Sequence, residues 1–492
     1  SNPLHFPPTG AEFRFCITTK TICPEYRMKR LIYTLLILII LIPAGLAVFL
    51  LYFFDPNDYR GQIETGFNKA TGRTMQISGD LGMTLFPRIG ISTGGITVSN
   101  AEGFGDAPFA SIKGSSVSLA LLPLLSGDIE MDKLVLDGVQ ANLVTLPGGK
   151  TNWDDLAGGD AGPAADTSSD SDSGKAIGAL AIGGIELKNA DITWDDRVAA
   201  TLIHLTEMNL NTGEIRFDQG IPIKFDTHFT MNGNELSGDM KASARATIDK
   251  GMKKVRLDKL ENTVEATGSL LQGGRLSQEV SANADIDLDG PVIAMQGAKL
   301  TIGTSGGTLG DTRAKTTFTS DINVNLATQK ISLSGTDLVL DADGEMLEGG
   351  KASAKMTSNV KMDLADLKVT LNNTDLVANL DGPLLEGGTI VATVKSDILV
   401  DLNSMMLTSK SVDSVIDMAS SMVPVNPMKV TLSTPLTVNL NELAIDMPAM
   451  QYNIPGSQGT GSLKLSKFDQ PLPTVVLKLD TPEFIADPWL GE

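Results

Sequence analysis

The stretch Ser358-Asn-Val-Lys-Met-Asp-Leu364 decides the fold, because close copies of it recur at a fixed interval of 38 residues. The other copies end at Leu288, Leu326, Leu402 and Leu440, and a weaker one ends at Lys250. A repeat of this period is typical of one small structural unit stacked in a row. Stacked units form long continuous surfaces far more often than compact catalytic pockets, so the repeat favours such a surface.

Each unit begins with a long strand that has one apolar and one polar face. Between residues 353 and 364, the even positions are apolar except for Ser358, and the odd positions carry mostly Lys, Thr, Asn and Asp. Residues 390–402 repeat this pattern in the next unit. Strict alternation indicates a strand with one dry and one wet face. A run of about 13 residues is roughly 43 Å long at about 3.3 Å per residue.

A second strand, residues 368–380, follows a short turn in the same unit. Its apolar phase shifts between Leu371 and Leu376, so we expect a β-bulge within residues 372–375. Asp381-Gly382 and the glycines after Glu386 supply turn residues. Each unit is therefore predicted to be a long β-hairpin. Successive hairpins would continue as an antiparallel meander of about 12 strands between residues 206 and 450, roughly 60 Å wide.

The apolar face of this meander must be covered. A dry core between two packed sheets is one solution, and a sheet curled into a groove that holds apolar molecules is the other. The unbroken repeat favours the groove, because sandwiches have less regular strands and Greek-key connections. The predicted groove lining is Ile286, Leu288, Val324, Leu326, Ala354, Met356, Val360, Met362, Leu364, Ile390, Val394, Ile398, Val400, Leu402, Val438 and Leu440.

One segment of the late repeats has helical rather than strand spacing. Its apolar residues are Val412, Val415, Ile416, Ala419, Met422 and Val423, just before Pro424. Such a stripe predicts a helix. The helix would pack over the open sheet or act as a gate for the groove.

Composition and motifs argue against several function classes. The net charge of −20 disfavours a nucleic-acid partner, which needs a basic patch. His204 and His228 lie in strand-like context, and Gly90-Ile-Ser92-Thr-Gly94 lacks the strand-turn-helix context of a nucleophile elbow. We find no phosphate-binding loop and no zinc-ligand spacing. The sequence therefore predicts a protein that is not an enzyme and needs no cofactor or metal.

Residues 31–54 form a stretch of 24 residues without a charge, with Leu31 and Phe54 at its ends. At 1.5 Å per residue this is enough to cross a bilayer, so we expect a transmembrane anchor. A cleaved signal peptide is the alternative. Lys29 and Arg30 precede the stretch, which places residues 1–30 in the cytoplasm and the body outside. Met28-Lys29-Arg30 resembles a natural start, so residues 1–27 are candidates for a foreign extension.

Three further segments are expected after the anchor. Residues 55–157 are predicted to be an N-terminal β domain that opens with an amphipathic cap helix over residues 57–70. Tyr59, Ile63 and Phe67 form the apolar stripe of this helix, and Gly72 stands at its C-terminal cap. Residues 158–176 read as an acidic flexible linker. Residues 177–492 hold the repeating hairpins.

The segment from Lys29 to Leu156 resembles the AsmA family of diderm bacteria. The likeness is carried by Asp55-Pro-Asn-Asp-Tyr59, Ala70-Thr-Gly-Arg73, Leu85-Phe-Pro87, Asn100-Ala-Glu-Gly-Phe-Gly105, Pro108-Phe-Ala110, Leu121-Leu-Pro-Leu-Leu125, Leu136-Asp-Gly138 and Asn152-Trp153. The resemblance implies an inner-membrane protein with a periplasmic body linked to outer-membrane biogenesis. It also implies kinship with bridge-like lipid-transfer proteins, whose repeating β-groove carries acyl chains below a cap helix.

These observations lead to one main functional hypothesis and one alternative. The main one is a periplasmic β-groove protein, anchored in the inner membrane, that binds phospholipid acyl chains or transfers them between the inner and outer membranes. The alternative is a periplasmic adaptor that assists outer-membrane protein assembly without carrying lipid. Phospholipids and the inner membrane are the expected partners, with outer-membrane or periplasmic proteins as further candidates.

Overall fold

The computed structural model describes residues 55–84, 88–120, 130–156, 181–467 and 473–490. The chain divides into two units, residues 1–58 and 59–492, and the second holds nearly all of the described residues. The predicted anchor with Leu31 and Phe54, the tail 1–30 and the linker 158–176 lie outside the described ranges. No helix among the described residues is long and apolar enough to cross a membrane.

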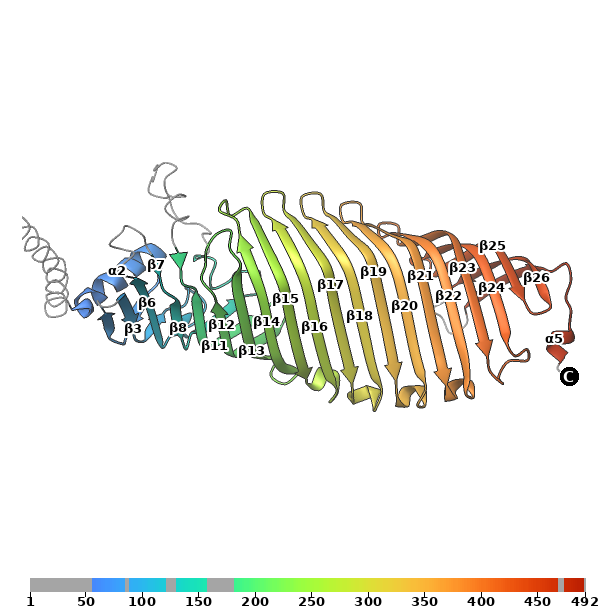
Figure 1. The fold of residues 1–492 in the computed structure, drawn as a ribbon, viewed down its shortest axis with the longest axis horizontal. Coiled ribbons are helices and arrows are strands. Elements are labelled where there is room, and N and C mark those ends of the chain that lie inside the picture. Colours follow the sequence, from blue (N-terminus) through green and yellow to red (C-terminus); the bar gives the residue numbers. More distant parts are fainter. Residues whose placement is uncertain (1–54, 85–87, 121–129, 157–180, 468–472, 491–492) are drawn as a thin grey trace, which may run out of the picture. The chain divides into compact units, whose positions relative to one another are not determined.

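The described residues are mainly β, in a single sheet of 27 strands with a few short helices (Figure 1). The helices are η1 (Pro56–Tyr59), α2 (Arg60–Thr71), η2 (Ser269–Leu271), η3 (Gly307–Leu309), η4 (Glu345–Leu347), η5 (Pro383–Leu385) and α5 (Asp487–Leu490). The first strands are β1 (Met75–Ile77), β2 (Leu81–Thr84), β3 (Arg88–Thr93), β4 (Ile96–Val98), β5 (Ala110–Ile112), β6 (Gly114–Ala120), β7 (Glu130–Met131), β8 (Leu134–Asp137), β9 (Gln140–Thr145) and β10 (Ala181–Ile182).

The remaining strands form the long antiparallel meander that the repeat predicts. They are β11 (Ile185–Asp196), β12 (Thr201–Thr212), β13 (Ile221–Met231), β14 (Leu236–Ile248), β15 (Lys254–Thr267), β16 (Arg275–Asp287), β17 (Val292–Ser305), β18 (Arg313–Asn325), β19 (Lys330–Asp343), β20 (Lys351–Asp363), β21 (Lys368–Gly382), β22 (Gly388–Asp401), β23 (Met406–Ala419), β24 (Met428–Asn439), β25 (Ala444–Ile454), β26 (Ser457–Ser466) and β27 (Thr474–Asp480). Each pairs with the next. Twelve of them, β13 to β24, lie within residues 206–450 as predicted, and the meander extends beyond both ends of that range.

The sheet continues from the N-terminal strands into the repeats without a break. β8 and β9 both pair with β11 in parallel, Leu134 opposite Ile185 and Gln140 opposite Asp191. β11 pairs with β12 on its other edge. At about 4.8 Å per strand, the meander from β11 to β27 is roughly 77 Å wide, and it remains open at β27 rather than closing into a barrel.

A line of β-bulges crosses the meander once per repeat. Lys259, Gly297, Gly335 and Asn373 each adopt positive φ, between 51° and 60°. The predicted bulge within residues 372–375 is confirmed, because the pairing of β21 with β22 shifts between Leu371 and Thr374. Bulges bend a sheet and increase its twist. The repeated bulge therefore bends every second strand at the same position along its length.

Each bulge leaves backbone N–H and C=O groups without a partner on the neighbouring strand. A pair of residues in the 38-residue repeat, such as Ser358-Asn359, forms hydrogen bonds with these groups. The bulge N–H groups donate to an Asn or Asp on the following strand: Lys259 to Asn283 (2.9 Å), Gly297 to Asp321 (2.8 Å), Gly335 to Asn359 (3.0 Å) and Asn373 to Asp397 (2.6 Å). The residue before these acceptors points inward, and Ser320 and Ser358 donate to carbonyl oxygens of Ser334 and Asn372 on the next strand. The Ser-Asp or Ser-Asn pair thus serves two bulges on two different strands.

Asn359→Ala should destabilise the meander by about 1 kcal/mol, because the Gly335 N–H loses its acceptor. The measurement is amide hydrogen exchange of β19 and β20, which reports the local stability of these strands. Asn323→Ala, which removes an outward Asn from the neighbouring strand β18, is the matched control. Equal exchange rates in the two variants would contradict the assigned role of Asn359.

The predicted helix from Val412 to Val423 is wrong. This segment is the second half of strand β23, which pairs with β22 and β24, followed by a turn. Val412, Ile416 and Met418 point to the apolar face, while Val415 lies on the outer face between them. One outward valine inside a strand thus produces spacing that resembles a helical stripe. The inward residues of this segment pair with inward residues of β22 and β24, so the segment forms a strand rather than a helix.

The predicted N-terminal helix is present as α2, and Gly72 forms its left-handed C-cap (φ 73°) as expected. Tyr59 and Ile63 are 44% and 45% exposed and Phe67 is half-buried, so their stripe does not form a packed core. Polar side chains join α2 to the edge strand: Ile77 N–H donates to Glu64 Oε1 (2.8 Å), and an Arg60 N–H donates to the Gly79 carbonyl oxygen (2.8 Å). The helix thereby satisfies backbone groups along the N-terminal edge of the sheet.

Candidate functional site

The candidate site is the apolar face of the meander. Strand register brings its residues into rows across the sheet: Val360 is opposite Leu371, which is opposite Ile398. The next row joins Met362, Val369 and Val400 in the same way. Ala354, Met356, Ile390 and Val394 lie on the same face of β20 and β22, and Ile286, Val324 and Val438 lie on it in β16, β18 and β24.

The predicted lining residues differ in exposure according to their place along the strand. Val360 is 7% exposed, and most of the others are half-buried. Leu288, Leu326, Leu364, Leu402 and Leu440 follow the strand ends and are 41% to 56% exposed. These five leucines form one edge of the apolar face, with each backbone N–H bonded to the carbonyl of a residue 35 positions earlier, such as Leu402 to Leu367 (2.9 Å). The face is therefore less exposed in the middle of the strands than at this edge.

The inward residues next to the bulges have small, buried side chains, and we call this row the floor of the apolar face. They are Thr227, Ala282, Ala298, Ser320, Thr336, Ser358, Thr374, Ser409 and Thr434, each below 9% exposed. All described strands belong to one sheet, so no second sheet covers these residues within the described ranges. In a single layer, small side chains become buried when their face is concave and larger flanking side chains close over them. The apolar face is therefore the inside of the curl.

Hydroxyl groups on this floor bond to each other and to backbone carbonyls. Ser320 and Thr336 are 3.1 Å apart, Ser358 and Thr374 are 2.9 Å apart, and Ser396 and Ser409 are 2.8 Å apart, measured between their oxygens. Because these groups satisfy one another and the bulge carbonyls, they add little polarity to the face. Outside bulges and turns, no inward position of the described strands β12 to β27 carries a charged side chain.

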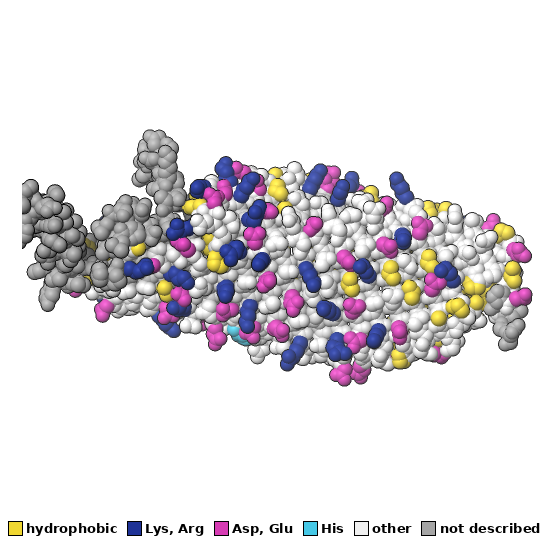
Figure 2. All heavy atoms as spheres, viewed as in Figure 1, with side chains coloured by type: hydrophobic (Ala, Val, Ile, Leu, Met, Phe, Trp, Pro, Cys, Tyr) yellow, Lys and Arg dark blue, Asp and Glu magenta, His cyan; other side chains and the backbone are white. Residues whose placement is uncertain are grey.

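The outer face of the meander is polar and carries charges of both signs, which Figure 2 shows interspersed over the strands. Cross-strand ion pairs include Lys355 with Asp337 (2.9 Å) and Arg256 with Asp285 (2.8 Å). The hydrogen bond that Arg256 donates to Asp285 raises the pKa of Arg256. Exposed pairs of this kind contribute little stability. The outer face therefore serves mainly to keep the sheet soluble.

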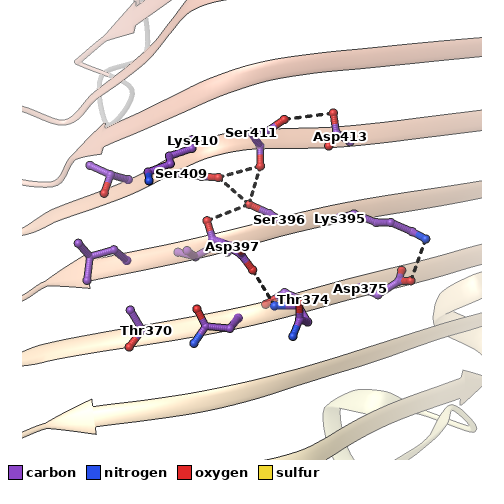
Figure 3. A pocket seen from close by; sticks show the side chains of 15 residues that line it. Thr370, Thr374, Asp375, Lys395, Ser396, Asp397, Ser409, Lys410, Ser411 and Asp413 are labelled. Atoms are coloured by element: carbon purple, nitrogen blue, oxygen red, sulfur yellow. Dashed lines mark hydrogen bonds and ion pairs between the residues drawn. The ribbon is translucent and has the colours of Figure 1, made fainter.

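An open hollow of about 840 Å³ lies at the bulges of β21, β22 and β23. It is lined by outward residues of these strands, including Asp375, Lys395 and Asp413, and by Thr374, Ser396 and Ser409 (Figure 3). Figure 3 also shows Ser396 directed to Ser409 and Ser411 on one neighbouring strand, while Asp397 reaches the other. Its side chains are already joined by ion pairs and hydrogen bonds, so we assign the hollow to the bulge network.

The outer face also brings together a Ser, a His and an Asp that the sequence did not link. On the β13–β14 hairpin, His228 Nδ1 is 2.9 Å from Asp239 Oδ1, and its Nε2 is 3.3 Å from Ser237 Oγ. His204 makes a similar contact with Asp191 (2.7 Å). His228 and Asp239 are exposed on an open strand surface. Cross-strand pairing accounts for both contacts, and the prediction that the protein is not an enzyme stays a prediction.

Residues from several of the motifs that resemble the AsmA family meet in one cluster beside α2. Arg73 is 3% exposed and donates to both carboxylate oxygens of Asp155 (2.8 and 2.5 Å) and to the carbonyl oxygen of Asn152 (2.6 Å). Its guanidinium lies 4.6 Å from the centre of the Phe109 ring. The hydrogen bond from Arg73 lowers the pKa of Asp155. We call Arg73, Phe109, Asn152 and Asp155 the Arg73 cluster.

Asn152 is fully buried and joins three segments within the Arg73 cluster. Its Oδ1 accepts the Val144 N–H (2.9 Å), and its Nδ2 donates to the Asn142 carbonyl (2.7 Å) and to Asn100 Oδ1 (2.9 Å). The resemblance to the AsmA family included Asn100 and Asn152 in its motifs but gave no structural reason for them. Their role here is to fix the C-terminal end of α2 against the loops that flank β4, β5 and β9.

Comparison with known proteins supports the resemblance to the AsmA family. Residues 25–447 match the model of the AsmA family. The chain is similar to Protein AsmA of Escherichia coli (strain K12), with 29% identity over 116 residues that cover 24% of this chain and 18% of that protein. No solved structure matches the chain. The family model spans well over half of the sequence, so the chain belongs to the AsmA family.

Proposed function

We propose that this chain is a periplasmic protein, anchored in the inner membrane, whose curled sheet forms a groove for phospholipid acyl chains. One observation carries the proposal: an uncharged aliphatic face lines the inside of a single-layer sheet, and no second layer covers it within the described residues. If water filled the curl, the aliphatic side chains of this face would gain no free energy from burial. Acyl chains supply the missing layer.

The proposed mechanism is partition of hydrocarbon between water and the groove. Each buried CH₂ contributes about 0.8 kcal/mol. Aliphatic side chains such as Val360, Ile398 and Val400 suit flexible chains and make few demands on the head group. The groove would carry lipid between the inner and outer membranes and so support outer-membrane biogenesis. No catalytic step and no cofactor is part of this mechanism.

Photo-crosslinking from adjacent positions of one strand tests the proposal. A photoreactive amino acid at Val394, which points inward, should capture phospholipid in cells, because acyl chains lie against it. The same amino acid at Thr393, its outward neighbour, is the control and should capture none. Mass spectrometry of the crosslinked full-length protein identifies the adduct. Absence of lipid at Val394, or equal capture at both positions, would contradict the groove.

The adaptor function has one observation in its favour. The last described strand, β27, pairs only with β26, and Val475, Leu477 and Leu479 on it are 54% to 56% exposed. An exposed edge strand can pair with a strand of another protein. A crosslink from β27 to an outer-membrane protein, combined with no lipid at Val394, would favour this function over lipid transfer.

A further inference from the structure

Two amide side chains interrupt the apolar face on β15 and β16, the fifth and sixth strands of the meander. Asn262 on β15 is opposite Ala242 and Val280, and Gln278 on β16 is opposite Val264 and Ile302. Outside bulges and turns, Asn262 and Gln278 are the only inward residues of the described strands β12 to β27 that carry an amide side chain. The hydroxyl groups of the floor are small and satisfied, so this amide pair is the strongest polar feature on the face.

The two amides are partly satisfied by each other and by the backbone. Asn262 Nδ2 donates to the Lys241 carbonyl oxygen (3.2 Å), and Gln278 Nε2 donates to Asn262 Oδ1 (3.4 Å). A Gln amide has two N–H donors and one carbonyl acceptor. Within the described residues, the second Gln278 N–H and its Oε1 bond to no other side chain or backbone group. Both residues are half-buried, so these groups can be reached from the groove.

Such a pair is costly in a groove filled with hydrocarbon. An amide covered by apolar material without a hydrogen-bond partner loses on the order of 1–3 kcal/mol. The aliphatic residues that occupy equivalent inward positions elsewhere in the repeats would avoid this cost. The cost disappears when the material in the groove brings its own hydrogen-bonding group to the position of Gln278.

We propose that Asn262 and Gln278 form a binding site for the ester carbonyl of an acyl lipid within the groove. The free Gln278 N–H donates to the carbonyl oxygen, and Asn262 holds the Gln278 amide in place through its own bond to Lys241. The acyl tail then lies along the neighbouring aliphatic rows. This inference rests on the proposed function and adds to it a fixed position at which the lipid is held.

Competition between two probes tests the site in the full-length protein. A long-chain methyl ester and the alkane with the same number of heavy atoms each displace a fluorescent polyene fatty acid. The ratio of ester affinity to alkane affinity should be about fivefold higher in the wild type than in a variant without the amides, the gain expected of one hydrogen bond. Asn262→Leu combined with Gln278→Leu should show this fall in the ratio and bind the alkane at least as well as before.

Matched variants separate the site from general effects on folding. Asn323→Leu with Gln451→Leu removes two exposed amides from the outer face and should keep the wild-type ratio. Gln278→Met alone retains the shape of the side chain and should lower the ratio, even if the double variant folds poorly. An unchanged ratio in Gln278→Met overturns the site but leaves the groove intact. Failure of both probes to bind the wild type overturns the proposed function as well.

Discussion

Val360→Asp combined with Ile398→Asp should lower the phospholipid that co-purifies with the protein at least tenfold. Both residues face Leu371 in one row on the inside of the curl, and Val360 is 7% exposed. Two carboxylates there would have to lie against acyl chains, and burying an unpaired charge costs far more than the 1.4 kcal/mol that a tenfold change requires. Lipid is measured per mole of full-length protein after mild detergent extraction.

A neighbouring residue provides the matched control for this substitution. Leu399 follows Ile398 on β22 but points to the outer face and is 39% exposed. Leu399→Asp therefore introduces the same charge on the same strand and should leave the lipid content unchanged. Circular dichroism checks that each variant keeps its strand content. A double variant that is folded and carries the normal amount of lipid would show that the inner face does not hold acyl chains.

Arg73→Ala should destabilise the N-terminal part of the sheet by about 3 kcal/mol, because it removes a buried guanidinium and its four hydrogen bonds to Asp155, Asn152 and Ser99. Hydrogen exchange is the suitable measurement, since a long repeating sheet does not unfold in two states. Amides of β9 should exchange on the order of 100-fold faster in the variant. Arg88→Ala, which breaks an exposed pair with Asp132, should change exchange by less than about fivefold.

The Arg73 cluster also predicts a pH dependence. Because the pKa of Asp155 is lowered in the folded state, its stabilising effect is fully present above the ordinary pKa of about 3.9 and is lost as pH falls through the lowered value. Protection of β9 in the wild type should therefore fall in this acid range. In Arg73→Ala the fall should be smaller. Equal acid sensitivity of the two proteins would show that Asp155 is not stabilised by Arg73.

The alternation of the strands could be predicted from the sequence, because every second residue between Ala354 and Leu364 faces the same way whatever its neighbours are. The bulge near Asn373 was also predictable, since an inserted residue shifts the apolar phase. The helix proposed around Val415 failed because the spacing of that segment fits both structures. Only the inward residues of β22 and β24 on either side decide between them.

Other features depend on contacts that no local pattern contains. Arg73 and Asp155 meet across 82 positions, and each is an ordinary surface-type residue in the sequence. The aspartates and asparagines of the repeat signature read as a wet strand face. In the structure, Asn359 accepts a bulge N–H, and Asp363 accepts turn N–H groups that lower its pKa. Asn262 and Gln278 became distinctive only when register placed them among aliphatic partners.

The Ser-Asn pair at 358–359 bonds to β21 on one side and to β19 on the other. An insertion of one strand, or of a few residues, would put the hydroxyl and the amide beside the wrong backbone groups. A whole hairpin can be added or removed without this mismatch. We therefore expect length to vary among such proteins in steps of one hairpin, roughly 10 Å each. The span of a relative would then follow from counting its repeats.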